Sequence, residues 1–156
     1  MIVIVKLIHL AAAIFWMGGM AFMILALRPA AVAMLQPPER LMLTGAVWKR
    51  FFPIVIVSIV ALFATGTNLY TTAFRAIKAA TGQGAVPLGW NLMLVLGLLM
   101  IAIFGHIYFA GYAKFKRAMG ALDWPLAGKA AAQIHILMIT NFVLGWLAIA
   151  AVRLVR

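Results

Sequence analysis

The chain has 156 residues, of which 67% are hydrophobic and 10% are charged, and it contains no cysteine. Its mean hydropathy of +1.14 excludes an ordinary water-soluble domain, in which about 25% of residues are charged. The composition also excludes a disordered chain, a disulfide scaffold, and any zinc or iron–sulfur site with cysteine ligands. Because the apolar segments are far longer than the ~10 residues of a membrane β-strand, we expect transmembrane helices.

The net charge of +11 comes from 13 Lys and Arg against 2 Asp and Glu. In a soluble domain this balance would indicate nucleic-acid binding. Here the basic residues stand between apolar segments, where cytoplasmic loops and lipid headgroups require them. We therefore expect membrane lipid, and not nucleic acid, as the partner of these charges.

Four apolar segments follow one another along the chain, and each exceeds the ~20 residues that cross the hydrocarbon layer. We place them at 2–27, 51–74, 90–113 and 130–152. The first is too long for the apolar core of a cleaved signal peptide, and we expect it to end at Arg28-Pro29. Pro53 falls in the first turn of the second span, and the breaker-rich segment 81–87 precedes the third. The segment that begins at Pro37-Pro38 predicts a short interfacial helix.

These segments predict one domain, an all-α transmembrane bundle of four antiparallel helices with both termini on the same side. The loops after the first and third spans hold eight basic residues: Arg28, Arg40, Lys49, Arg50, Lys114, Lys116, Arg117 and Lys129. The opposite side holds five, which are Lys6, Arg75, Lys78, Arg153 and Arg156. The positive-inside rule therefore predicts that the first and third loops are cytoplasmic and that both termini lie on the opposite side of the membrane.

Histidines are the residues inside the spans that are plainly able to bind a metal, and ionisable groups in a membrane mark functional sites by default. His106 lies about 10 Å inside the cytoplasmic end of the third span, and His135 lies about 8 Å inside the same end of the fourth. This matched depth suits the two axial ligands of one haem, which would be b-type because the chain lacks cysteine. Four basic residues at that membrane edge are candidate partners of the propionates: Lys114, Lys116, Arg117 and Lys129. The alternative is that both histidines serve only helix packing.

His9 lies near the outer end of the first span, about 14 Å or more in depth from the other two histidines. One interpretation is a hydrogen bond from His9 to Thr65 or Asn68 in the second span. The other is a ligand for a second, outer cofactor or metal ion. A third chemistry is Cu(I) binding by His9 with soft thioether ligands, which are Met17, Met20 and Met23. The sequence contains no Ser-His-Asp set, phosphate loop or paired carboxylates, so hydrolysis and phosphoryl transfer are not expected.

The first span reads Lys6-Leu-Ile-His9-Leu-Ala-Ala-Ala-Ile-Phe-Trp16-Met-Gly-Gly19 and resembles the opening helix of the CopD-like membrane proteins. That resemblance implies copper resistance or uptake across the bacterial inner membrane, and both termini would then be periplasmic. HemJ-type four-helix proteins share the early histidine and are associated with b-type haem, so the resemblance gives His9 a ligand role. This chain departs from them: it has Trp90-Asn91 where they have a lysine, and its fourth span has no acidic residue.

We therefore expect a b-type haem protein that transfers electrons, with quinone or a redox protein as its partner. If it is an enzyme, it is a haem-dependent membrane oxidoreductase, and no catalytic residue is identifiable. The alternatives are a CopD-type copper protein and a cofactor-free accessory subunit of a membrane complex or homo-oligomer. The sequence leaves these open.

Overall fold

The computed structural model describes residues 2–155, so Arg156 lies outside the described part. The helices in chain order are α1 (Ile2–Phe22), the π-helix η1 (Met23–Leu27), α2 (Arg28–Met34), α3 (Pro37–Thr81), α4 (Leu88–His106), the π-helix η2 (Ile107–Tyr112), α5 (Ala113–Gly120) and α6 (Trp124–Leu154). They join into four continuous rods, 2–34, 37–81, 88–120 and 124–154, each long and apolar enough to cross a membrane. The predicted all-α four-helix membrane bundle is confirmed.

The first rod does not end at Arg28-Pro29, which corrects the predicted boundary. The π-helical turn η1 comes immediately before, and Pro29 lies in the first turn of α2. A π-helical turn changes the pattern of backbone hydrogen bonds, so the N–H that proline lacks is accommodated without a break. The helical rod therefore continues to Met34.

The segment at Pro37-Pro38 is not a separate interfacial helix, which is a second correction. It is the first turn of α3, a single helix of 45 residues in which Pro53 is an interior residue and not part of the first turn. Gln36 and Glu39 form a capping box at its start, and a Glu39 carboxylate oxygen accepts from the Gln36 N–H at 3.2 Å. The helix continues because Leu41 and Trp48 of this segment are buried in the common core.

The spacing of basic residues along three rods indicates where the membrane lies. Lys6 and Arg28 are 22 residues apart, Lys49 and Arg75 are 26, and Lys129 and Arg153 are 24. At 1.5 Å per residue these are about 33–39 Å, close to the ~40 Å of a bilayer with its headgroup regions. The rods are longer than this, so their ends project beyond the hydrocarbon.

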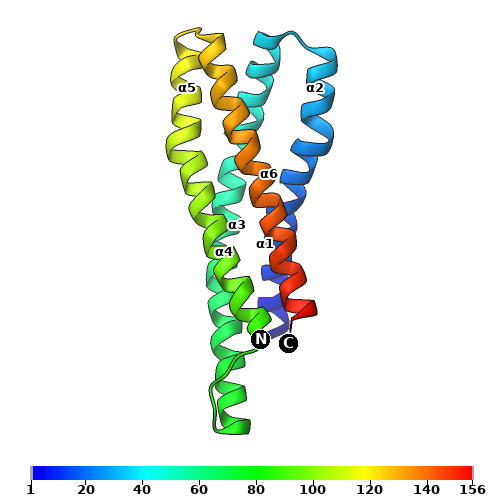
Figure 1. The fold of residues 1–156 in the computed structure, drawn as a ribbon, viewed down its shortest axis with the longest axis vertical. Coiled ribbons are helices and arrows are strands. Elements are labelled where there is room, and N and C mark those ends of the chain that lie inside the picture. The colour runs from blue at the N-terminus through cyan, green and yellow to red at the C-terminus, as the bar shows by residue number, and fades with distance from the viewer. Residues whose placement is uncertain (1, 156) are drawn as a thin grey trace.

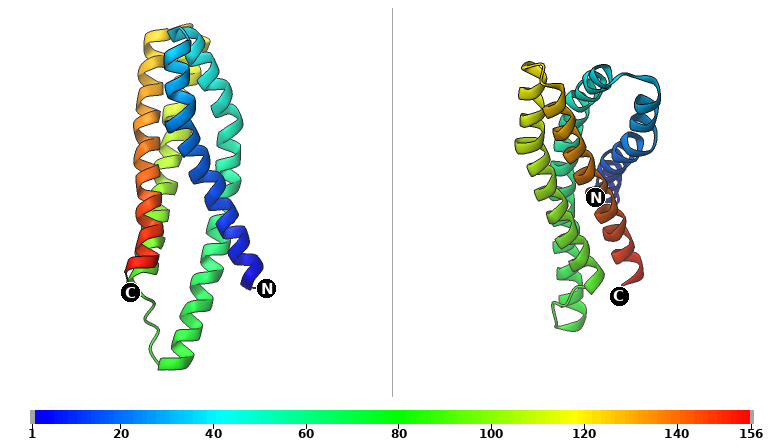
Figure 2. Two further views of the ribbon diagram at one scale, coloured as in Figure 1. Left: turned by 90° about the vertical axis from the view of Figure 1, so that its right-hand side faces the viewer. Right: turned by 45° about the horizontal axis from the view of Figure 1, so that its top comes forward.

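The rods alternate in direction, and both described ends of the chain lie in the same half of the molecule, opposite the α2–α3 and α5–α6 turns (Figure 1). The α3–α4 connection projects beyond the termini in every view (Figure 2). The α2–α3 and α5–α6 turns belong to what we call the basic end, because all eight basic residues predicted for the first and third loops lie toward it.

The molecule consists of two closely packed helix pairs, α1 with α3 and α4 with α6. In the second pair, a Cβ added at Gly89 would collide with the Ala151 carbonyl oxygen, so only glycine allows this approach. The core toward the basic end is aromatic. The Phe52 ring packs edge-on against Tyr112 at 4.9 Å, and the Trp48 ring packs against Phe115 at 5.0 Å. These contacts join α3 to the third rod.

Candidate functional site

His9 of α1 is half-buried and faces α3 in the half of the bundle away from the basic end. Its Nδ1 lies 2.8 Å from the Oγ1 of Thr65. The Thr65 hydroxyl donates to the Ala61 carbonyl oxygen at 2.5 Å within α3. Since that proton is used by Ala61, the proton in the His9–Thr65 contact comes from the imidazole. His9 Nδ1 therefore carries hydrogen, and Nε2 keeps its lone pair.

Of the two predicted partners of His9, the structure selects Thr65. Asn68 is exposed, whereas Thr65 is buried. The next residue, Gly66, lies against the imidazole, and a Cβ added there would be 3.4 Å from His9 Cε1. The hydrogen-bonding interpretation of His9 is thus confirmed, and it leaves one ring nitrogen available to a ligand.

The register of α4 against α6 places His106 and His135 at one level. The Asn141 side-chain N–H donates to the Met100 carbonyl at 3.1 Å and fixes this register. His106 lies six residues beyond Met100, and His135 lies six residues before Asn141. Because the helices are antiparallel, these equal steps bring both histidines to the same depth.

The faces of the two histidines differ. The contact surface between α4 and α6, which we call the α4–α6 seam, is formed by the residues next to the two histidines. Ile107 and Ile134 are fully buried there, and Ile134 lies against Gly111. His106 is exposed on the outside of the bundle, whereas His135 is half-buried. The structure thus supports the predicted depth of this pair, and it places neither imidazole in the seam itself.

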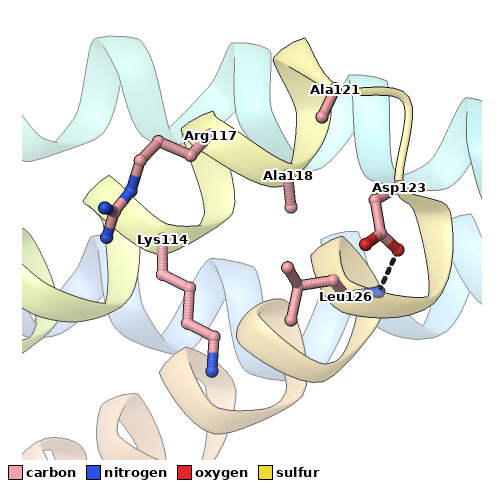
Figure 3. Close-up of a pocket in the computed structure, with 6 residues that line it drawn as sticks. All are labelled: Lys114, Arg117, Ala118, Ala121, Asp123 and Leu126. Atoms are coloured by element: carbon pink, nitrogen blue, oxygen red, sulfur yellow. Dashed lines mark hydrogen bonds between the residues drawn. The ribbon is translucent and has the colours of Figure 1, made fainter.

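The four basic residues predicted as propionate partners are all exposed, and they separate into different surroundings. Lys114 and Arg117 line a small surface pocket of about 430 Å³ between α5 and the start of α6. In this pocket Asp123 caps α6 by accepting from the Leu126 N–H at 2.9 Å (Figure 3). Lys116 points elsewhere, with its Nζ 4.9 Å from the centre of the Tyr112 ring.

The methionines of the copper hypothesis fill the interior. Met20 and Met23 are buried in the hydrophobic core, and Met17 lies against Gly145 of α6. They stand 8 to 14 residues from His9, which is about 12–21 Å along the helix. His9 and these thioethers are therefore too far apart to share one ion. Among residues 2–155, no group of three or more His, Asp or Glu side chains could hold a metal ion together.

The sequence reasoning missed a groove of about 590 Å³ between α3 and the η2–α5 segment. We call it the aromatic groove, and it is lined by Trp48, Phe52, Tyr108, Tyr112 and Phe115, with the exposed lysines Lys49 and Lys116. The signal that would have revealed it is the four-residue spacing of aromatic residues, first at Trp48 and Phe52 and again at Tyr108 and Tyr112 in the third span.

A second missed feature is Asn141, which is 1% exposed. Its side-chain oxygen Oδ1 is buried and accepts no hydrogen bond from any donor within residues 2–155. Its amide N–H holds the α4–α6 register described above.

No family model, curated protein or solved structure matches this chain. The CopD-like resemblance therefore stays a prediction.

Proposed function

We propose that this chain is a multi-pass inner-membrane protein that binds b-type haem through intramembrane histidines and transfers electrons. The observation that carries the proposal is the set of hydrogen bonds from His9 through Thr65 to the Ala61 carbonyl. A histidine that ligates iron characteristically donates its other ring N–H to an oxygen, which fixes the ring and its tautomer. Haem, when bound, supplies reversible one-electron chemistry.

The purely structural alternative for His9 is weaker. The Thr65 hydroxyl already donates to a carbonyl of its own helix, so α3 needs no bond from α1 to satisfy it. A half-buried imidazole near the membrane edge is a costly way to add one interhelical hydrogen bond. Ligation of a metal through Nε2 would explain why a histidine stands at position 9, whereas helix packing alone does not require one.

His106 and His135 are two further candidate ligands toward the basic end, and they face different sides of the α4–α6 pair. They lie at one level on adjacent helices, and His106 is exposed where acyl chains would otherwise surround it. A polar ring in that environment favours a bound partner, either a ligand or a neighbouring protein chain. The donor set suits haem iron, because both residues are imidazoles and cysteine is absent.

The membrane setting defines the remaining parts of the proposal. The eight basic residues of the basic end favour a cytoplasmic location for that end and a periplasmic location for both termini. A quinone dissolved in the bilayer, or a redox protein at its surface, would exchange the electrons.

The test is an absorbance spectrum of the full chain purified in detergent, before and after reduction with dithionite. A Soret band with sharp α and β bands on reduction supports the proposal. His9→Ala should remove one haem signal. If His106 and His135 share one haem, changing either to Ala should give a high-spin or haem-free second site, and the double change should add little.

A colourless preparation, after expression with added haem precursor, would contradict the proposal. Unchanged haem content in a folded His9→Ala protein would remove His9 from the ligand set. Copper in a colourless protein would favour the copper alternative.

A further inference from the structure

The aromatic groove lies at the basic end, where α3 and the η2–α5 segment diverge on the outside of the bundle. The contact between the Trp48 and Phe115 rings forms its base. Lys49 and Lys116 each follow one of these aromatic residues in the sequence, so the two lysines flank the groove at one level. This level is the headgroup region defined by the spacing of basic residues along the rods.

The charge of the groove is not compensated by the chain. There are 13 basic residues and only 2 acidic ones. Both acidic side chains, Glu39 and Asp123, accept hydrogen bonds from backbone N–H groups at helix starts. The position of Lys116 is fixed by its contact with the Tyr112 ring, whose face attracts a cation. An anion that neutralises this pair of lysines therefore has to come from outside the chain.

From the lysines toward the membrane centre, the surface of α3 becomes apolar. Pro53 lines the groove, and Val57 and Val60 stand one and two turns further along the same face. Val57 is 68% exposed and Val60 is 64% exposed. A ligand that fits this surface has an anionic head at the lysines and a long apolar tail directed toward the membrane centre.

Pro53 leaves the Lys49 carbonyl oxygen of α3 without its usual helical donor. It has no N–H, so it cannot donate to the Lys49 carbonyl as an ordinary residue of α3 would. A headgroup that carries hydroxyl donors would complement this carbonyl oxygen as well as the two ammonium groups. Phosphatidylglycerol has both properties.

We propose that the aromatic groove is a binding site for an acidic phospholipid with a hydroxylated headgroup, namely phosphatidylglycerol. Lys49 and Lys116 bind its phosphate, and the face of Pro53, Val57 and Val60 receives an acyl chain. Basic pockets between transmembrane helices are a known means of holding anionic lipid headgroups. This inference does not depend on haem binding.

Native mass spectrometry of the full chain, released from detergent with phosphatidylglycerol or phosphatidylcholine added, tests the proposal. We expect bound phosphatidylglycerol and markedly less phosphatidylcholine at equal concentration. The variant Lys49→Gln/Lys116→Gln should bind phosphatidylglycerol about 30-fold more weakly, because each lysine near the surface contributes about 1 kcal/mol.

The matched control is Lys114→Gln/Arg117→Gln, which removes two charges of the same end from the neighbouring pocket in Figure 3. It should keep affinity within about threefold of the parent, as expected for general screening of charge. Circular dichroism and size-exclusion chromatography establish that both variants fold.

Equal losses in the two double variants would overturn the proposal, because they would show nonspecific attraction to the basic end. Equal binding of the two lipids would overturn it too. Displacement of the lipid by millimolar inorganic phosphate would assign the lysines to free phosphate. Binding of a short-chain quinone in place of phosphatidylglycerol, lost in Lys49→Gln/Lys116→Gln, would reassign the groove to quinone.

Discussion

At the scale of single residues, the intramembrane polar groups of this protein differ in how completely they are satisfied. The Thr65 hydroxyl donates to Ala61 and accepts from His9. The Tyr70 hydroxyl donates to the Asn91 side chain at 2.7 Å and links α3 to α4. The side-chain N–H of Asn141 donates a hydrogen bond, but its side-chain oxygen Oδ1 has no partner among the described residues. Since water is absent from the bilayer core, the pairing of each such group influences the stability of the bundle.

Thr65→Val tests the support that we assign to His9. It keeps the shape of the side chain but removes the acceptor of the imidazole N–H, so we expect about 0.6–2 kcal/mol of lost stability. Haem affinity should fall about 10- to 100-fold, as when other supporting partners of metal ligands are removed. Thr67→Val is the control, because Thr67 is exposed and its hydroxyl bonds only to the Phe63 carbonyl of its own helix. Haem titration and unfolding in denaturing detergent measure both effects, and equal results for the two variants would contradict the assignment.

Asn141→Leu tests the polar contact in the α4–α6 seam. It keeps the approximate size of the side chain but removes the N–H donor to the Met100 carbonyl, so we expect a loss of about 0.6–2 kcal/mol. Thr140→Ala, at the exposed neighbouring position, should change stability by less than about 0.5 kcal/mol. An Asn141→Leu protein as stable as the parent would show that the Asn141–Met100 hydrogen bond does not hold the seam. Unfolding monitored by circular dichroism in mixed micelles provides the comparison.

At the scale of helices, close approach of backbones decides how α4 and α6 pack. Gly89 meets the Ala151 carbonyl near one end of the seam, and Gly111 meets Ile134 near the other. In a membrane there is little hydrophobic drive between helices, so packing depends on such small residues. The π-helix η2 lies in the same rod and places Tyr108 and Tyr112 side by side, with ring centres 6.1 Å apart, in the aromatic groove.

Gly89→Ala and Gly97→Ala form a matched pair on α4. A Cβ at position 89 would collide with backbone atoms of α6, whereas a Cβ at position 97 has no neighbour within 4 Å. We expect Gly89→Ala to destabilise the bundle by about 1–3 kcal/mol through overpacking. We expect Gly97→Ala to be neutral, or more stable by up to about 1 kcal/mol, because alanine favours helix. Thermal unfolding in detergent distinguishes them, and equal melting temperatures would refute the close approach of α4 and α6.

At the scale of the whole molecule, the distribution of charge relates the bundle to the bilayer. Basic residues bracket three of the rods at separations close to the thickness of a bilayer with its headgroups. Many large apolar side chains, among them Phe15, Phe109 and Trp146, are exposed, as contact with lipid allows. The aromatic core at the basic end and the polar His9–Thr65 contact in the other half give the molecule two chemically different halves.

Reporter fusions test the proposed orientation. A reporter at the C-terminus should be active in the periplasm, and one inserted in the α5–α6 turn at 121–123 should be active in the cytoplasm. The physical basis is the excess of eight basic residues over five. The reverse pattern would invert the orientation while leaving the fold unchanged. Paired fusions with a periplasmic and a cytoplasmic reporter at each site provide the control for expression.

The sequence by itself determined the class of this protein, because 156 residues with four long apolar segments have few ways to satisfy their backbone other than as membrane helices. It also determined the common depth of His106 and His135, since depth follows from residue count along a helix. Only the tertiary structure decided that the helix continues past Pro29 and through Pro53, because neighbouring turns and packing accommodate the missing N–H groups. It also selected Thr65 over Asn68 and created the aromatic groove, since both depend on which faces of separate helices meet.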